Sequence, residues 1–231
     1  AAIPNPLIEV GMNIAHQQQV QKLQVQKQTI AITATFTAEP VEDSLVFWMR
    51  EIEIPATIEF APYNQVFQQL LDPLSLLSQN QNGINIVLLR LEDWSRFDDG
   101  EEVKAGTEKV ERNVQDLVMA LKSTVAQSAT RYIVCLCPPS PAASADANRI
   151  AFFQQMEDMM GTELSNISNL YLIKTQDLNA YPVEDYYDPQ RDELGHIPFT
   201  PVFFTALGTA LARKIYAITS APHKVIVLDC D

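Results

Sequence analysis

Residues 84–91 are the most sheet-like run of the chain and constrain most strongly how it can fold. The run reads INIVLLRL, is rich in β-branched and other apolar residues, and follows the turn-forming pair Asn82-Gly83. Unbroken apolar residues are typical of a strand buried on both faces, as in the centre of a parallel sheet. We therefore expect this strand in the middle of the sheet. Its end leads through Arg90 into Glu92 and Asp93, at the edge where open parallel sheets bind ligands.

Strand-like and helix-like segments alternate along the rest of the chain. Further strands are expected at residues 29–36, 57–60, 131–137 and 170–174, and helices at residues 41–51, 63–71, 101–127, 145–164 and 200–217. Such alternation is typical of crossover connections, which produce a parallel sheet with helices on both faces. The sequence therefore predicts a three-layer α/β/α fold with five strands in the main domain.

The two ends of the chain differ from this main domain, which we place at residues 29–218. Residues 1–28 are rich in glutamine and carry a weak apolar stripe, which favours a linker or a peripheral helix. Residues 219–231 contain a polar segment with Pro222 and then the apolar run Val225–Leu228. We interpret this run as the first strand of a further domain, and expect additional protein before and after the sequence.

Charge and composition exclude some classes of partner. The chain has 231 residues, a formal net charge of -13 and a pI near 4.6. Nucleic-acid binding is disfavoured because phosphate backbones need clustered Lys and Arg, although a local pocket for a small phosphate stays open. No apolar stretch reaches the roughly 18 residues that span a bilayer, and residues 1–10 lack signal-peptide features, so we expect a cytoplasmic protein without membrane contact. The spacings of Cys135, Cys137 and Cys230 fit neither a disulfide framework nor a four-ligand zinc site, which favours reduced thiols.

A loop before the last helix places Asp192 and His196 close together. A carboxylate can orient an imidazole and support it as a general base, as in hydrolase triads. The alternative is a helix-entry loop whose histidine only forms local hydrogen bonds. Candidate nucleophiles are Thr37, Ser44 and Ser140, which follow expected strands. None of them has a Gly-x-Ser-x-Gly setting, so capping or turn formation is the expected use of these hydroxyls.

Glu92 and Asp93 are candidates for an acid pair at the same edge. Adjacent residues on a strand point to opposite faces, so one of the two is expected to face a ligand, and Asp93 alternatively caps the next turn. Arg90 is expected either to pair with Glu92 or to receive an anionic substrate group. Cys135 and Cys137 share a strand face, where core packing is favoured over a metal pair.

Several segments together carry a resemblance to a known family. The run Ile226–Asp231 resembles the first motif of haloacid-dehalogenase-type phosphatases, a strand followed by Asp-x-Asp. Four further blocks, at residues 32–40, 88–94, 137–141 and 195–201, resemble the amino-terminal domain of FkbH-like proteins. That domain is similar to SGNH hydrolases, and Asp192 and His196 stand at the place of their last motif. The resemblance covers about residues 29–231, with the blocks in order, which is more specific than any single motif.

The resemblance implies an SGNH-hydrolase-like, flavodoxin-like sheet followed by the first strand of a truncated haloacid-dehalogenase-like domain. It implies a protein that takes a glyceryl unit from 1,3-bisphosphoglycerate, removes phosphate, and loads the unit onto the phosphopantetheine thiol of a carrier protein in polyketide or nonribosomal peptide synthesis. Asp229 would accept the phosphoryl group or bind Mg²⁺, and Asp231 would serve as general acid and as the second metal-site aspartate. Substrate is expected to contact Thr37, Arg90, Asp93 and Ser140.

The sequence departs from the family pattern in two ways. The Gly-Asp-Ser motif of SGNH hydrolases is replaced around Thr37-Ala38-Glu39, and the phosphatase-like region stops after Asp231. Both departures remove parts that nucleophilic or metal-assisted hydrolysis needs. We therefore expect these residues to act mainly as a docking or substrate-positioning domain for the downstream domain. The alternative is an acyltransferase or thioesterase that uses Asp192 and His196 as a dyad.

Overall fold

The fold is built on a five-stranded parallel sheet. The computed structural model describes residues 27–96 and 103–220. The strand order is β2-β1-β3-β4-β5, and every neighbouring pair is parallel. The strands are Gln28–Ala34 (β1), Ala56–Phe60 (β2), Ile84–Leu89 (β3), Arg131–Leu136 (β4) and Leu170–Ile173 (β5). This arrangement confirms the predicted α/β class and the central place of β3.

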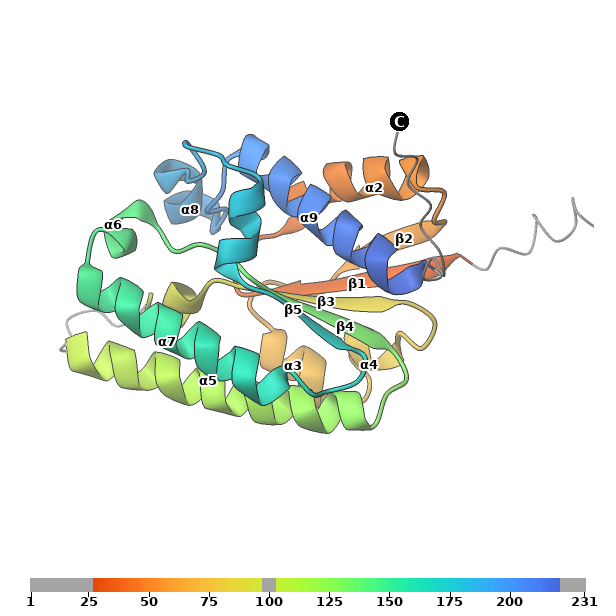
Figure 1. Cartoon of the computed structure of the whole chain (residues 1–231), viewed down its shortest axis with the longest axis horizontal. Helices are drawn as coiled ribbons and strands as arrows, with labels where there is room; N and C mark the ends of the chain where they lie inside the picture. The colour runs from red at the N-terminus through yellow and green to blue at the C-terminus, as the bar shows by residue number, and fades with distance from the viewer. Residues whose placement is uncertain (1–26, 97–102, 221–231) are drawn as a thin grey trace, which may run out of the picture.

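Helices cover both faces of the sheet. The α-helices are Glu42–Glu51 (α2), Val66–Leu71 (α3), Leu76–Gln79 (α4), Val103–Ala126 (α5), Pro141–Ser144 (α6), Ala147–Leu164 (α7), Pro189–Gly195 (α8) and Pro201–Thr219 (α9), and the 3₁₀ helices are Glu39–Val41 (η1), Leu91–Ser95 (η2) and Thr175–Ala180 (η3). In Figure 1, α2 and α9 lie on one face of the sheet, and α3, α5 and α7 lie on the other. The molecule therefore has three layers.

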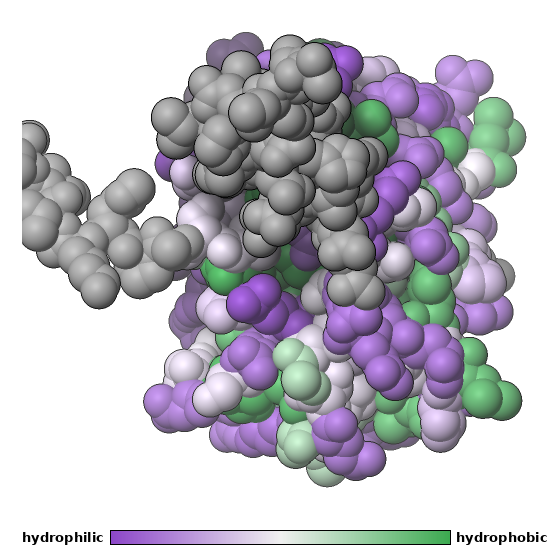
Figure 2. All heavy atoms as spheres, turned by 90° about the vertical axis from the view of Figure 1, so that its right-hand side faces the viewer, coloured by the Kyte–Doolittle hydropathy of each residue, from purple (hydrophilic) through white to green (hydrophobic). Residues whose placement is uncertain are grey.

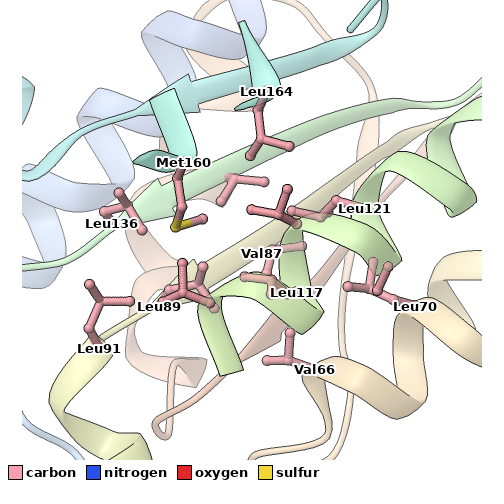
Figure 3. Close-up of a cluster of buried hydrophobic side chains, with 14 of the residues drawn as sticks. Val66, Leu70, Val87, Leu89, Leu91, Leu117, Leu121, Leu136, Met160 and Leu164 are labelled. Carbon is pink, nitrogen blue, oxygen red and sulfur yellow. The ribbon is translucent and has the colours of Figure 1, made fainter. Parts of the chain in front are cut away.

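Strand β3 is fully buried because it contributes to both cores. Ile86 and Leu88 belong to the cluster under α2 and α9. Val87 and Leu89 belong to the opposite cluster with side chains of α3, α5 and α7 (Figure 3). Full burial of each such side chain stabilises the fold by about 1.5–3 kcal/mol. Gly83 is required at the entry to the strand, because a Cβ there would lie 1.8 Å from the carbonyl oxygen of Thr29.

Strand β3 ends two residues earlier than the sequence predicts. The backbone N–H of Arg90 donates to Oγ1 of Thr35 at 2.9 Å, and the Arg90 carbonyl accepts from the N–H of Asp93 at 3.0 Å. The second bond begins the 3₁₀ turn η2. The expectation that Glu92 and Asp93 point to opposite faces of a strand is therefore wrong, because neither residue lies on a strand.

Other predicted boundaries shift for local reasons. The helix expected at 63–71 begins at Val66, since Asn64 has a left-handed backbone with φ 55°. The helix expected at 145–164 is preceded by the separate short helix α6, and Asp146 caps the start of α7. Helix α8 was not expected from the sequence. The predictions for residues 1–26 and for Val225–Leu228 lie outside the described residues.

The sheet end that carries the amino termini of the strands lies opposite the candidate site. Figure 2 looks onto this end, where hydrophilic residues predominate and hydrophobic residues are scattered between them. Within residues 27–96 and 103–220, no helix combines the length and the hydrophobicity needed to cross a membrane.

Candidate functional site

Polar side chains from four segments converge at the carboxyl edge of the sheet. They come from the loop after β1, from the segment that follows β3, from the loop after β4, and from α8 with the residue after it. The predicted site residues that the structure brings together here are Thr37, Arg90, Asp93, Ser140, Asp192 and His196. Asp229 and Asp231 lie outside the described residues, so their predicted roles stay predictions.

A buried arginine is the centre of this cluster. The Arg90 side chain is 1% exposed, and its Nε and Nη2 donate to Oδ1 of Asp93 at 2.9 and 2.5 Å. Its Nη1 and Nη2 donate to the two carboxylate oxygens of Asp192 at 2.8 and 3.1 Å. Nη1 also lies 3.4 Å from Oε1 of Glu92. All three guanidinium nitrogens thus contact carboxylates of the protein, and a substrate anion would reach Arg90 only by displacing them.

Thr35 also binds the carboxylate of Asp93, and its role was not predicted from the sequence. Its Oγ1 donates to Oδ2 of Asp93 at 2.9 Å while it accepts from the N–H of Arg90. The hydroxyl is buried and serves as a link between the end of β1 and the start of η2. The one sequence signal for Thr35 was its place at the end of the first expected strand, close to Thr37.

The two buried aspartates respond differently to their surroundings. Burial raises the pKa of Asp93, and the attraction of Arg90 only partly offsets this effect. Burial also acts to raise the pKa of Asp192, but hydrogen bonds from Arg90 and Arg96 outweigh it, so the pKa of Asp192 is lowered. Asp192 is therefore held as a carboxylate by two arginines.

Arg96, which follows η2, connects Asp192 to the ring of His196. One guanidinium nitrogen donates to Oδ1 of Asp192, and another contacts Nδ1 of His196. Because a guanidinium has no acceptor atom, Arg96 must be the donor and Nδ1 the acceptor. The ring proton of a neutral His196 therefore lies on Nε2. Arg96 was not among the predicted site residues, although it lies only three residues after Asp93.

The position of the His196 ring is fixed from several directions. The ring stacks on Tyr63 with centroids 4.8 Å apart and an interplanar angle of 11°. The backbone of His196 is left-handed, with φ 54°, and its carbonyl accepts from the N–H of Thr37 at 2.8 Å. A left-handed backbone at a non-glycine residue costs on the order of 1 kcal/mol and is found preferentially at functional sites.

The candidate nucleophile hydroxyls donate to other acceptors. Thr37 Oγ1 donates to the Gly195 carbonyl at 2.7 Å, and Ser140 Oγ donates to Glu92 at 2.9 Å while it caps α6. Ser44 Oγ donates to the Thr205 carbonyl at 3.2 Å, where α2 packs on α9. In this arrangement, none of these three hydroxyls donates a hydrogen bond to the imidazole of His196.

Tyr187 is a further hydrogen-bond partner of Asp192. Its hydroxyl donates to Oδ2 of Asp192 at 2.9 Å. Burial, followed by the hydrogen bond and charge of Asp192, raises the pKa of Tyr187 to about 12. Asp192 thus receives hydrogen bonds from Arg90, Arg96 and Tyr187, which uses most of its acceptor capacity.

The described residues do not assemble a metal centre. Across residues 27–96 and 103–220, no group of three or more His, Cys, Asp or Glu side chains is arranged to hold a metal ion. Cys135 and Cys137 are both buried in the core, and burial raises the pKa of the Cys137 thiol. The Mg²⁺ site implied by Asp229 and Asp231 lies outside the described residues.

Comparison with known proteins shows the fold. No protein-family model and no curated protein matches the sequence. Among solved structures, the N-terminal part of BF1531 from Bacteroides fragilis, which contains a phosphatase domain complexed with Mg, matches with a TM-score of 0.66 and 17% identity over 85% of this chain. The match covers 53% of the BF1531 chain, so this protein spans about half the length of that structure.

The second kind of neighbour is an esterase. Two catalytic mutants of Axe2, an acetylxylan esterase from Geobacillus stearothermophilus, match with TM-scores of 0.51 and 0.52, each with 10% identity over 81% of this chain and 94% of the other. At these identities the matches show the fold alone. The chain therefore has the three-layer α/β fold of SGNH hydrolases, with a five-stranded parallel sheet in the order 2-1-3-4-5.

Proposed function

We propose that the chain is the SGNH-like domain of an FkbH-like glyceryl-loading protein, and that it positions substrate or docks partners for a downstream haloacid-dehalogenase-like domain. The whole protein would take a glyceryl unit from 1,3-bisphosphoglycerate, release phosphate, and load the unit onto a carrier-protein thiol. The four family-like blocks and the Asp-x-Asp run support this proposal. The BF1531 structure, which matches this fold over 53% of its chain and contains a phosphatase domain, agrees with it.

The hydrogen bond from Arg96 to Nδ1 of His196 is the observation that carries the proposal. In a hydrolase triad, Nδ1–H donates to the carboxylate, and Nε2 accepts the proton of the nucleophile. Here Nδ1 is an acceptor, so Nε2 carries the proton of the neutral ring. His196 is then a hydrogen-bond donor to substrate rather than a general base. The commitment of Thr37 and Ser140 to other acceptors agrees with this role.

The cluster is well suited to hold a substrate without reacting with it. Arg90 joins Asp93 and Asp192 across the edge of the sheet, so the side chains that surround the site have fixed positions. Arg96 is 21% exposed and can donate to the oxygen atoms of a glyceryl or phosphate group. Mg²⁺ in the complete protein would supply charge neutralisation for phosphoryl chemistry next to Asp229 and Asp231.

The alternative function is an acyltransferase or thioesterase based on Asp192 and His196. It is favoured by the ionised state of Asp192 and by the esterase neighbours with the same fold. It requires Arg96 to leave Nδ1 so that the carboxylate of Asp192 can bind the imidazole, and it requires a nucleophile.

Two assays separate these functions. The complete protein, with the domain expected after Asp231, is incubated with 1,3-bisphosphoglycerate and a phosphopantetheine-bearing carrier protein, and the glyceryl thioester is detected by mass spectrometry. We expect loading to fall on the order of 100-fold in His196→Ala, because misplaced substrate reacts slowly. Lys122→Ala is the control, because it removes only an exposed ion pair between α5 and α7, that of Lys122 with Glu163.

The second assay measures turnover of p-nitrophenyl acetate by the 231-residue chain. Negligible turnover is expected for the unmodified chain and for His196→Ala. The reason is that His196 with its proton on Nε2 cannot accept the proton of a nucleophile. Turnover that disappears in His196→Ala would refute the positioning function and establish the alternative.

A further inference from the structure

A hollow of about 400 Å³ lies beside the candidate site at the carboxyl edge of the sheet. Its walls come from the loop after β4, from η3 and the loop that follows it, and from the start of α9. Three aromatic rings line it, those of Tyr181, Tyr186 and Phe203, together with the apolar side chains of Leu178 and Val183. A volume of this size with a largely apolar lining is typical of small-molecule pockets.

The charge at the walls of this hollow is negative. Among the described residues that line it, Glu184 is the one with a charged side chain. Glu184 is exposed, and within residues 27–96 and 103–220 no lysine or arginine forms an ion pair with its carboxylate. A second carboxylate, that of Glu157 on α7, accepts from the N–H and the hydroxyl of the lining residue Thr175 at 3.3 and 2.5 Å. A cleft lined by charge of one sign attracts ligands of the opposite sign, so the hollow favours a cation.

Two cationic side chains beside the walls have partners of their own. Lys174, next to Thr175, pairs with Asp158 at 2.8 Å. Arg213 of α9 is not a lining residue; it donates to the hydroxyl of Tyr181 at 2.8 Å, and its guanidinium lies 5.8 Å from the centroid of that ring. Because like charges repel, a cationic ligand is expected to keep away from the ring of Tyr181.

The rings of Tyr186 and Phe203 provide a contact surface that no arginine covers in the described part of the chain. Their centroids lie 5.9 Å apart, and the hydroxyl of Tyr186 donates to the carbonyl of Pro139 at 2.8 Å, which fixes the position of the tyrosine. The faces of such rings attract cations as well as apolar groups. A ligand with an ammonium group next to an apolar body can therefore use these rings and the carboxylate of Glu184 together.

We infer that this hollow binds a small primary amine with an apolar body. The ammonium group would pair with the carboxylate of Glu184, and the body would lie against Leu178, Val183 and Phe203. A primary amine has three N–H donors, of which a second can reach the side-chain oxygen of the lining residue Asn179. None of these residues belongs to the Arg90 cluster, so the inference does not depend on the proposed function.

The test is an NMR titration of the 231-residue chain at pH 7 with phenethylamine and with its neutral counterpart, phenethyl alcohol. We expect phenethylamine to bind about tenfold more tightly, through the combined effect of an ion pair and a cation–π contact. In Glu184→Gln this preference should fall below about twofold, and Val183→Trp should weaken both ligands by filling the hollow. Glu163→Gln is the matched control, because it removes an exposed carboxylate from α7 and should leave both affinities unchanged.

Four results would overturn the inference. They are no saturable binding of phenethylamine, equal binding of the amine and the alcohol, an unchanged preference in Glu184→Gln, or unchanged binding by folded Val183→Trp. Tighter binding of phenylacetate than of phenethylamine would also contradict it, and would assign the hollow to an anion instead. Because Glu184 is exposed, Glu184→Gln is expected to fold, so this variant decides the inference even if Val183→Trp does not fold.

Discussion

Arg96 donates to Nδ1 of His196, and this contact determines which ring nitrogen carries the proton. The same guanidinium also binds Asp192, so the carboxylate and the imidazole of the expected dyad are connected through an arginine. An arginine in this position keeps Asp192 ionised and makes His196 a donor at Nε2. The aspartate and histidine of a hydrolase dyad are thus present, but Arg96 between them makes the cluster a set of hydrogen-bond donors that suits binding of oxygen atoms.

The first prediction concerns the tautomer of His196. At pH 8, ¹⁵N chemical shifts of the His196 ring should show a protonated Nε2 and an unprotonated Nδ1. In Arg96→Ala, we expect a substantial population with the proton on Nδ1, since the donor that excludes it has been removed.

The control for this experiment is Arg149→Ala. Arg149 donates to Oγ of Ser95, next to Arg96, so this change removes a neighbouring guanidinium without touching the ring. The tautomer should stay unchanged in the control. Observation of Nδ1–H in the unmodified protein would contradict our assignment of His196 as a donor.

The second prediction concerns the stability that Arg90 provides. Replacing Arg90 by alanine leaves Arg96 as the remaining cation beside Asp93 and Asp192, and the loss of one partner from a buried ion pair typically costs about 3–5 kcal/mol. Arg50→Ala should change the free energy of unfolding by less than about 0.5 kcal/mol, because Arg50 pairs with Glu51 on the surface. Urea denaturation at pH 7 measures both values. A loss below about 1 kcal/mol in Arg90→Ala would show that the buried network is not a major source of stability.

The fold was predictable because its main signals are local. The unbroken apolar run at 84–91 identifies the central strand, and the alternation with helices identifies the parallel sheet. The end of β3 was not predictable from the same signal, since Leu91 continues the apolar pattern. The strand stops because Thr35, 55 residues away in the sequence, takes the N–H of Arg90.

The candidate site was predictable only in outline. The rule that parallel sheets bind ligands at their carboxyl edge identified Arg90 and Asp93, and the pairing of an acid with a histidine in one loop identified Asp192 and His196. Neither signal could show how their hydrogen bonds are shared, because Arg96 and His196 are 100 residues apart. The stacking of Tyr63 on His196 and the bond from Tyr187 to Asp192 were not predicted, since a loop tyrosine has no sequence signal for stacking or for a carboxylate partner.

The third prediction is that Asp93 and Asp192 give opposite pH dependences of stability. The pKa of Asp192 is lowered on folding, so its stabilising effect is complete above its unfolded value near 3.8 and is lost as the pH falls towards the folded value. The advantage of the unmodified protein over Asp192→Asn should therefore shrink below about pH 4. The pKa of Asp93 is raised, so ionisation of Asp93 above pH 3.8 opposes folding, and the advantage over Asp93→Asn should shrink as the pH rises. Thermal unfolding of the three proteins between pH 3 and pH 7 measures both differences, and a change of the same sign in the two variants would contradict the opposite roles of the carboxyl groups.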